Sequence, residues 1–380
     1  CIRDSSRTGL HPGEVTVAEM LSDAGYATGL FGKWHLGDHY QFLPLQHGFD
    51  EFWGIPYPNS MWPFHPRTFA EAGEDPRLTA ARDRAILVGY AGVSNPFPRG
   101  QGYPNMPTYD GDTIVEFNSD QSTFGTLFID KTLAFIEANQ NQPFFAYVPL
   151  SAPHVPLHPG PAFLGASGED LYGDTILEID AGVGRILDKL TELGLENDTL
   201  VIFISDNGPN LDYGIDGGDP GPFSGGKETQ GEGGIRIPAL MRWPGQLPAG
   251  TVITEMASII DVMPTIAGVT RATLPSDRTL DGVNLWPFLT GATSTPPHDA
   301  LYSFIETYWD TTAVELGTVR SGDWKLHVAT SGATNTPIAL YNLATDPAET
   351  TDVSGSEPAV VAGILALADA KVAEIIADQR

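Results

Sequence analysis

The 380-residue sequence has one cysteine, few basic residues and no long apolar run. A single cysteine, Cys1, cannot form a disulfide within the chain, so cysteine usage leaves the redox compartment open between the cytosol and a bacterial periplasm. No stretch of roughly 18 consecutive apolar residues occurs, and we therefore expect no membrane-spanning helix. A hydrophobic content of 41% in a chain of this length predicts a globular protein with a large core.

The basic residues are outnumbered by the acidic ones, 20 against 48, which gives a formal net charge of −28. Such a chain repels nucleic-acid phosphates and anionic membrane surfaces, so we expect no nucleic-acid partner. The acidic residues are spread along the chain, which is typical of a solvated surface. Two of the few lysines, Lys33 and Lys227, lie in glycine-containing segments beside other polar residues. Cations kept in such places in an acidic protein indicate a site for an anion.

Apolar segments alternate with amphipathic ones over most of the chain. Strands that are apolar throughout are predicted near residues 27–31, 143–150, 200–204 and 236–243. Helices are predicted over residues 15–25, 125–139, 170–194 and 259–268. This alternation predicts an α/β fold with a mostly parallel sheet that is sandwiched by helices.

The pattern changes after about residue 289. Short strands are predicted over residues 300–306, 314–321, 324–329 and 338–342, followed by a helix over residues 358–378. These elements predict a smaller antiparallel sheet with a C-terminal helix. We therefore expect a main α/β domain over residues 1–289 and a small α+β subdomain over residues 290–380.

Polar side chains follow three of the predicted strands. Lys33 and His35 come after the first, and alternation of strand side chains predicts that the two point to the same side. His154 follows the second strand. Asp206 and Asn207 follow the third, and their oxygens suit Ca²⁺ or Mg²⁺, although Asp-Asn-Gly is also a common turn sequence. Ligands of open α/β sheets bind where strands end, which makes these residues candidates for one site.

A fourth segment, residues 223–234, is rich in glycine and carries Lys227. Its spacing differs from that of a P-loop, so the alternatives are a flexible surface loop and a loop whose backbone approaches a ligand. Two lysines, two histidines and a pair of oxygen ligands could together bind a tetrahedral oxyanion on a divalent metal. In such a site the cations offset negative charge on the anion, and the histidines move protons.

A resemblance to a known family rests on segments along most of the chain. They are residues 14–19, 25–29, 32–37, 48–57, 206–209, 226–227, 232–238, 243–245, 261–265 and 280–282. In sequence and order these segments resemble the type I, formylglycine-dependent sulfatases of the alkaline phosphatase superfamily, and among them the arylsulfatase A-like members. The resemblance runs from about residue 5 to about residue 350.

The resemblance implies hydrolysis of small-molecule or carbohydrate sulfate esters at a calcium site, with Mg²⁺ as the less expected metal. It implies that Lys33 binds the aldehyde hydrate and the sulfate, and that His35 takes a proton from the hydrate. It further implies that His154 binds substrate and protonates the leaving alcohol, and that Lys227 contacts the sulfate. The Asp206–Asn207 pair would ligate calcium.

Parts of the family pattern are missing from the sequence. The family nucleophile is a formylglycine made from the cysteine of Cys-x-Pro-Ser-Arg, whereas Cys1 is followed by Ile-Arg-Asp. The upstream Asp-Asp pair that completes the metal site is also absent, and Pro58 stands where the family has a serine, for which Asn59 or Ser60 could substitute. We therefore expect a sulfatase truncated at its amino end, lacking one core strand and the nucleophile, and inactive by itself. The resemblance implies a periplasmic or secreted parent protein, while a cytoplasmic location and a homo-oligomer are left open.

Two alternatives remain beside a sulfatase. The first is a phosphomonoester or phosphonate hydrolase of the same superfamily, and the second is a homologue that binds without catalysis. The set of two lysines and two histidines favours a sulfatase, because a phosphatase would be expected to carry more metal ligands. Five aromatic residues could either form a stacking platform for aryl or sugar rings or pack the loops between residues 38 and 121. They are Trp53, Tyr57, Trp62, Phe64 and Tyr103.

Overall fold

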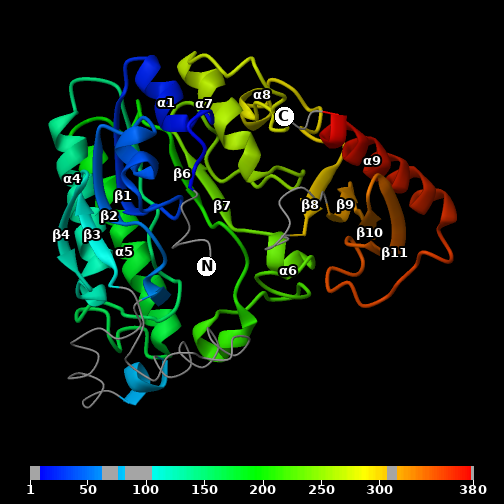
Figure 1. Ribbon diagram of the computed structural model, residues 1–380, viewed down its shortest axis with the longest axis horizontal. Helices are drawn as coiled ribbons and strands as arrows, with labels where there is room; N and C mark the ends of the chain where they lie inside the picture. Colours follow the sequence, from blue (N-terminus) through cyan, green and yellow to red (C-terminus); the bar gives the residue numbers. More distant parts are fainter. Residues whose placement is uncertain (1–8, 62–75, 82–104, 306–314, 378–380) are drawn as a thin grey trace. The chain divides into compact units, whose positions relative to one another are not determined.

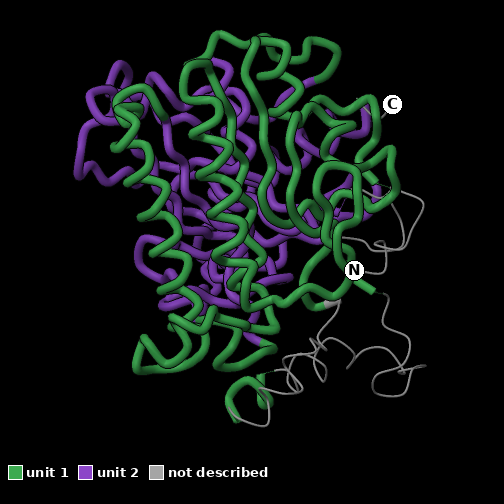
Figure 2. Tube along the Cα trace, turned by 90° about the vertical axis from the view of Figure 1, so that its left-hand side faces the viewer, with its two compact units in different colours: residues 1–199, 212–218, 269–278 green, residues 200–211, 219–268, 279–380 purple. Residues whose placement is uncertain are grey.

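The computed structural model describes residues 9–61, 76–81, 105–305 and 315–377. The chain divides into two compact units, shown by colour in Figure 2. Unit 1 comprises residues 1–199, 212–218 and 269–278, and unit 2 comprises residues 200–211, 219–268 and 279–380. The boundary expected near residue 289 stays a prediction. Within the described ranges no helix has both the length and the apolar character needed to span a bilayer.

Unit 1 is built on a five-stranded mixed sheet, sheet A, in the order β4-β3-β2-β1-β5. The strands are β1 (Ala27–Lys33), β2 (Glu51–Ile55), β3 (Pro107–Asp110), β4 (Thr113–Phe117) and β5 (Phe144–Tyr147). Strand β1 runs parallel to both of its neighbours, so Leu30 stands opposite Phe52 on one side and Tyr147 on the other. Because β1 has a strand on each side and contacts α4 and α1, its inner residues are buried.

Three of the helices of unit 1 bear on the candidate site. They are α1 (Val17–Asp23), α4 (Phe124–Ala138) and α5 (Leu171–Glu192). Helix α1 begins with a capping box in which Thr16 Oγ1 accepts the Glu19 amide at 3.0 Å and the Glu19 carboxylate accepts the Thr16 amide at 2.7 Å. Helices α4 and α5 lie side by side, and α4 packs on β1 with Phe135 against Phe31 (Figure 1).

Unit 2 contains a two-stranded antiparallel sheet and a four-stranded antiparallel sheet, sheet C, in the order β11-β10-β9-β8. The strands are β6 (Val201–Ile204), β7 (Ala239–Arg242), β8 (Leu301–Phe304), β9 (Leu316–Ser321), β10 (Trp324–Ser331) and β11 (Thr334–Asn342). The helices are α6 (Glu232–Ile235), α7 (Val262–Thr270), α8 (Trp286–Leu289) and α9 (Pro358–Ala377). Helix α9 packs on sheet C, where Leu326, Leu340 and Val372 are fully buried (Figure 1).

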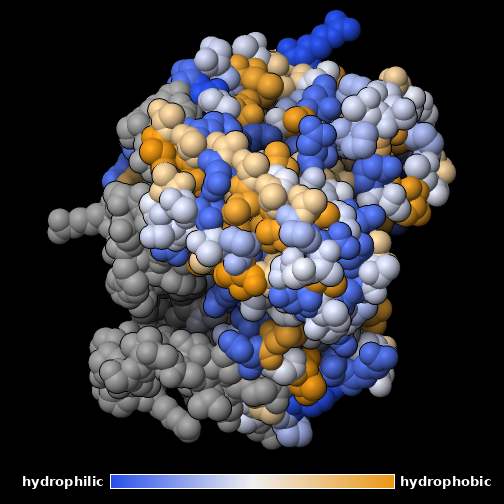
Figure 3. Space-filling model, turned by 90° about the vertical axis from the view of Figure 1, so that its right-hand side faces the viewer, coloured by the Kyte–Doolittle hydropathy of each residue, from blue (hydrophilic) through white to orange (hydrophobic). Residues whose placement is uncertain are grey.

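The α/β prediction is confirmed by sheet A with its helices, by the separate antiparallel sheet C and by the C-terminal helix. Two predicted strands are less buried than expected, since Tyr147 of β5 and Phe203 of β6 are 46% and 37% exposed. Among the described residues β5 is an edge strand of sheet A, and β6 pairs only with β7. On the face of the molecule in Figure 3, hydrophilic and hydrophobic residues are interspersed, as expected for acidic residues spread along the sequence.

Candidate functional site

Lys33 is the last residue of β1, and its amide donates to Pro149 O at 2.7 Å, in the segment that follows β5. The preceding residue, Gly32, has φ +147°, and a Cβ there would lie 2.1 Å from Pro149 O. Only glycine allows this close approach of the two backbones. The glycine before Lys33 thus holds the lysine backbone against the segment that leads to His154.

His35 lies beyond the end of β1 in a left-handed conformation with φ +65°. The alternation on which we based a shared direction for Lys33 and His35 therefore ends before the histidine. Instead, the His35 amide donates to Pro56 O at 2.8 Å, and its ring contacts the Tyr57 ring edge-on at 6.4 Å. The segment after β2 thus positions His35.

Trp34, between the lysine and the histidine, anchors this corner to the core of unit 1. Its side chain is 6% exposed and its indole Nε1 donates to Phe42 O at 2.7 Å. The indole also stacks on His47 and meets Phe49 edge-on, with 6.0 Å between ring centroids in each pair. A buried, hydrogen-bonded tryptophan fixes the backbone on both sides of it, and so the origins of the Lys33 and His35 side chains.

His154 lies in the loop after β5, and a side chain two residues past Tyr57 holds that loop. The Asn59 amide group donates to His154 O at 3.2 Å, to Pro156 O at 3.0 Å and to Gln121 Oε1 at 3.1 Å. His154 Nδ1 lies 2.7 Å from Val155 O. Because a carbonyl oxygen can only accept, this contact places a proton on Nδ1.

A small polar cavity of about 20 Å³ lies beside the His154 loop, with room for about one water molecule. Its lining includes Asn59, His154, His158 and Glu178. Asn59 Oδ1 and Glu178 Oε1 are buried and have no hydrogen-bond partner among the described residues. The cavity therefore offers two acceptor atoms to a donor such as water.

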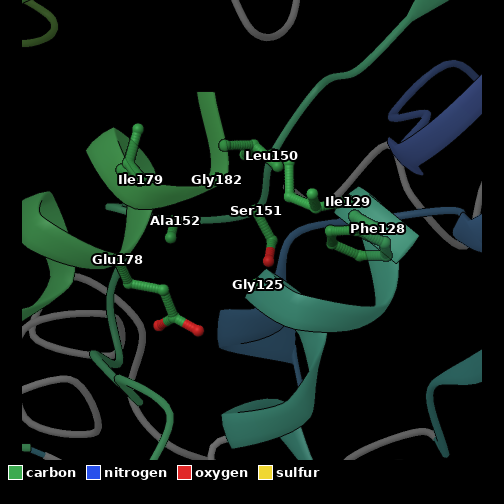
Figure 4. A pocket seen from close by; sticks show the side chains of 9 residues that line it. All are labelled: Gly125, Phe128, Ile129, Leu150, Ser151, Ala152, Glu178, Ile179 and Gly182. Carbon is green, nitrogen blue, oxygen red and sulfur yellow. The ribbon is translucent and has the colours of Figure 1, made fainter. Parts of the chain in front are cut away.

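Glu178 on α5 is a site residue that the sequence analysis missed. Burial raises the pKa of its carboxyl group, and one hydrogen bond from the Gly160 amide, at 3.0 Å, opposes that shift. Figure 4 shows its carboxylate on α5 and the Ser151 hydroxyl on the segment after β5, both lining a neighbouring pocket. A single glutamate in a helix gives no signal of a site in the sequence, because most glutamates are solvated.

Asp206, Asn207 and Lys227 belong to unit 2, where backbone contacts bring their segments together. Gly208 N donates to Gly234 O at 2.9 Å, and Lys227 N donates to Pro209 O at 2.7 Å. A Cβ on Gly208 would lie 1.8 Å from Gly233 O. The glycine-rich segment thus packs directly on the residues that follow β6.

The two proposed metal ligands offer few oxygens by themselves. The Asp206 side chain is exposed, and the Asn207 amide group donates to Gly208 O at 2.7 Å. Within the described part of the chain no three histidine, cysteine, aspartate or glutamate side chains form a group that could hold a metal ion. Calcium prefers six to eight oxygen ligands. The described residues therefore do not complete a calcium site, and we derive no step through a metal.

The five candidate aromatic residues differ in their contacts, and three of them lie outside the described residues. Trp53 packs edge-on against Phe128 with centroids 5.8 Å apart, so it serves the core of unit 1. Tyr57 is 5% exposed and contacts His35. The other three aromatic residues, Trp62, Phe64 and Tyr103, and also Cys1, lie outside the described residues. A stacking platform for aryl or sugar rings stays a prediction.

Comparison with known proteins gives the family. The "Sulfatase" family model matches residues 3–272, and the model "N-sulphoglucosamine sulphohydrolase, C-terminal" matches residues 227–369. Arylsulfatase A of Bos taurus is 36% identical over 92% of the chain and 68% of its own length. Steryl-sulfatase of Mus musculus is 33% identical over 80% of the chain and 55% of its own length, so the chain spans little more than half of that relative.

A solved structure, the PsFucS1 sulfatase from Pseudoalteromonas sp., shares the fold with a TM-score of 0.76 at 24% identity over 97% of the chain and 75% of its own. The family match covers more than half of the chain, and its segments include the ends of β1 and β6 and the glycine-rich segment. The chain belongs to the sulfatase family, as a type I sulfatase of the alkaline phosphatase superfamily.

Proposed function

We propose that the protein hydrolyses sulfate esters of small molecules or carbohydrates. The observation that carries this proposal is the segment after β2, which contacts both candidate histidines, His35 and His154. Pro56 O accepts the His35 amide, the Tyr57 ring contacts His35, and the Asn59 amide group donates to His154 O. A proton acceptor and a proton donor are thus fixed by one short stretch of chain, beside the strand that ends in Lys33.

Each side chain has a role that its surroundings support. Lys33 of unit 1 and Lys227 of unit 2 each carry a positive charge that can offset negative charge on sulfuryl oxygens. His154, with Nδ1 hydrogen-bonded to Val155 O, gives the Nε2 proton of its doubly protonated ring to the leaving alcohol oxygen. His35 accepts a proton on the side of the nucleophile.

The proposal includes a formylglycine nucleophile and a calcium ion, and the described residues supply neither in full. The sequence has no Cys-x-Pro-Ser-Arg segment, and Asp206 and Asn207 are two ligands of a larger set. We therefore propose that the 380-residue chain alone does not turn over sulfate esters.

The test is a hydrolysis assay with 4-nitrophenyl sulfate and 4-nitrophenyl phosphate. The chain is compared with a longer form that carries a Cys-x-Pro-Ser-Arg segment. We expect sulfate ester hydrolysis in the longer form alone. Turnover by the 380-residue chain would overturn the assignment of the nucleophile, and a preference for the phosphate ester would support the phosphatase alternative.

Variants of the longer form test the assigned residues. Lys33→Met and His154→Ala should lower kcat by about 10²- to 10³-fold, as expected when one charge-stabilising or proton-transferring group is lost. Lys131→Met is the matched control. It also removes a lysine of unit 1, but one with an exposed side chain that lies over the Trp53 ring and near Asp110. Equal activity losses in all three variants would contradict the assignment.

A further inference from the structure

A cluster of buried charges lies in unit 2, where sheet C meets the glycine-rich segment. Lys325 of β10 is fully buried, and its Nζ lies 3.1 Å from Glu232 Oε1 and 3.2 Å from Glu349 Oε1. Arg320 of β9 completes the cluster through Glu232 Oε2 at 2.9 Å. Two cations thus balance two carboxylates. Such a balanced set is sensitive to the loss of any one member, because removal leaves a buried charge unpaired.

Glu349 is the member of this cluster that reaches both ends of the glycine-rich segment. Its Oε1 accepts the Ser224 hydroxyl at 2.9 Å and the Glu232 amide at 2.6 Å. These partners are more than 100 positions away in sequence and lie on either side of Lys227. One carboxylate therefore joins the start and the end of the segment that carries the lysine.

The backbone conformation at Glu349 allows its carboxylate to contact these partners. Glu349 has φ +53°, in the left-handed region that residues with a side chain rarely adopt. The turn that carries it is held by Asp346, whose Oδ2 accepts the amides of Thr350 and Thr351 at 2.8 Å each. A strained backbone conformation persists when surrounding contacts hold it in place. At Glu349 these contacts are the Asp346 hydrogen bonds of the turn and the ion pairs of the charge cluster.

The carboxylate of Glu349 is charged at neutral pH. Burial acts to raise its pKa, but the hydrogen bonds from His327 and the Glu232 amide, with the charge of Lys325, lower it to about 2. A charged acceptor makes stronger hydrogen bonds than a neutral one. The contacts to Ser224 and Glu232 are therefore of the stronger kind.

The segment transmits this anchoring to Lys227 through its own backbone bonds. Gly233 N donates to Ser224 O at 2.8 Å, which closes the segment at the residue that Glu349 holds. Inside it, Thr229 Oγ1 donates to Gly226 O at 2.7 Å, next to Lys227. The Lys227 amide donates to Pro209 O, two residues after Asn207. Hydrogen bonds thus hold the segment at its two ends and also on either side of Lys227.

We propose that Glu349 is a positioning residue that holds the glycine-rich segment closed and thereby places Lys227 for contact with the sulfate group. This inference rests on the sulfate contact proposed for Lys227. The C-terminal part of the chain then contributes to the anion site without touching the anion.

The first test is hydrogen–deuterium exchange of the peptide that covers residues 224–234. Glu349→Gln should speed its exchange by about tenfold, because the charged acceptor of the Glu232 amide is lost. Ser224→Ala removes one anchor only and serves as a milder second variant. The control is Asp352→Asn in the same connection, since Asp352 accepts the amides of Leu340 and Ser354 and not those of the segment. Unchanged exchange in both test variants would overturn the proposal.

The second test is a titration of the full chain with sodium sulfate at constant ionic strength, in a double-mutant cycle with Lys227→Ala. Glu349→Gln should weaken sulfate binding on the order of tenfold when Lys227 is present, and should have no effect in the Lys227→Ala background. A merely structural role would weaken binding equally in both backgrounds, which would overturn the proposal.

The two tests distinguish failure of the inference from failure of the proposed function. If Lys227→Ala leaves sulfate affinity unchanged, Lys227 does not contact the sulfate. The proposal that Glu349 positions Lys227 for that contact then fails as well. The exchange result still decides whether Glu349 closes the segment.

Discussion

Single side chains decide the local geometry of the candidate site, and Asn59 is the clearest case. It is 5% exposed and donates to three acceptors, two of which are carbonyl oxygens of the His154 loop. From the sequence, Asn59 is a candidate replacement for a family serine at Pro58, which stays a prediction. The structure adds that the Asn59 amide group donates to the backbone around His154.

Asn59→Ala should lower the free energy of unfolding by about 2–3 kcal/mol, because it leaves buried carbonyl oxygens without a donor. The measurement is urea unfolding. The control is Asn105→Ala, since Asn105 is exposed and makes one side-chain hydrogen bond, to Asn118, and should change stability by less than about 0.5 kcal/mol. Similar losses of unfolding free energy in the two variants would contradict a stabilising role for the Asn59 amide group.

Candidate site residues can be proposed from sequence where a motif surrounds them, but not where only burial marks them. Lys33, His35, His154 and Lys227 are candidates because glycines, prolines and other polar residues surround them in recognisable segments. Glu178 could not be found, because its significance lies in burial within unit 1, which no single-residue pattern reveals.

At the scale of elements, close approach of backbones joins β6 to the glycine-rich segment. Gly208 meets Gly233 O so closely that a Cβ would lie 1.8 Å from that oxygen. The contact places the residues after β6 next to α6, and it depends on the absence of a side chain at Gly208.

Gly208→Ala should destabilise the protein by about 1–3 kcal/mol, because the backbone must move to accept the methyl group. The measurement is a thermal or urea unfolding curve. Gly355→Ala is the matched control, since a Cβ there meets nothing within 4 Å and its φ is not positive. A stable Gly208→Ala variant would be evidence against the tight packing of the segment on β6.

Helix α5 buries polar residues and exposes apolar ones. Ile176 is 40% exposed, whereas Asp174, Thr175 and Glu178 are buried. Asp174 is satisfied by Ser167 and by the Gly165 amide at 2.7 Å. Glu178 has one partner, and its raised pKa follows from burial.

Glu178→Gln should stabilise the protein at neutral pH and have little effect at acidic pH. A carboxyl group whose pKa is raised in the folded protein costs stability as pH rises above its ordinary value of 4.5, because the unfolded chain then ionises more easily. The measurement is the melting temperature of both proteins from pH 4 to pH 7. A difference that is constant with pH would contradict an ionisation effect.

Several elements were predicted well from sequence, but their neighbours were not, and strands β2, β3 and β4 lie where mainly loops were expected. Apolar periodicity and capping residues placed α1, α4 and α9 within a few residues of their observed ends. The same apolar runs predicted buried strands at β5 and β6, where the structure has an edge strand and a two-stranded pair. Hydrophobicity along a strand does not say which strand lies beside it.

At the scale of the whole molecule, the net charge of −28 acts on stability through repulsion among the acidic groups. The melting temperature should rise when potassium chloride increases from low concentration to about 0.5 M, because salt shortens the range of this repulsion. Exposed ion pairs weaken at the same time, but each contributes little. A melting temperature that falls with salt would show that ion pairs outweigh the repulsion.

The sequence by itself determined the family, the order of the elements and the candidate residues, because these depend on local patterns and on motifs in a fixed order. Only the tertiary structure decided what holds those residues. Asn59 reaches the His154 loop, Glu349 reaches Ser224 and Glu232, and Glu178 lies in a polar cavity, each through contacts between positions far apart in the chain. The physical reason is that a buried polar group is defined by its partners, and partners distant in sequence are chosen by packing rather than by any local pattern.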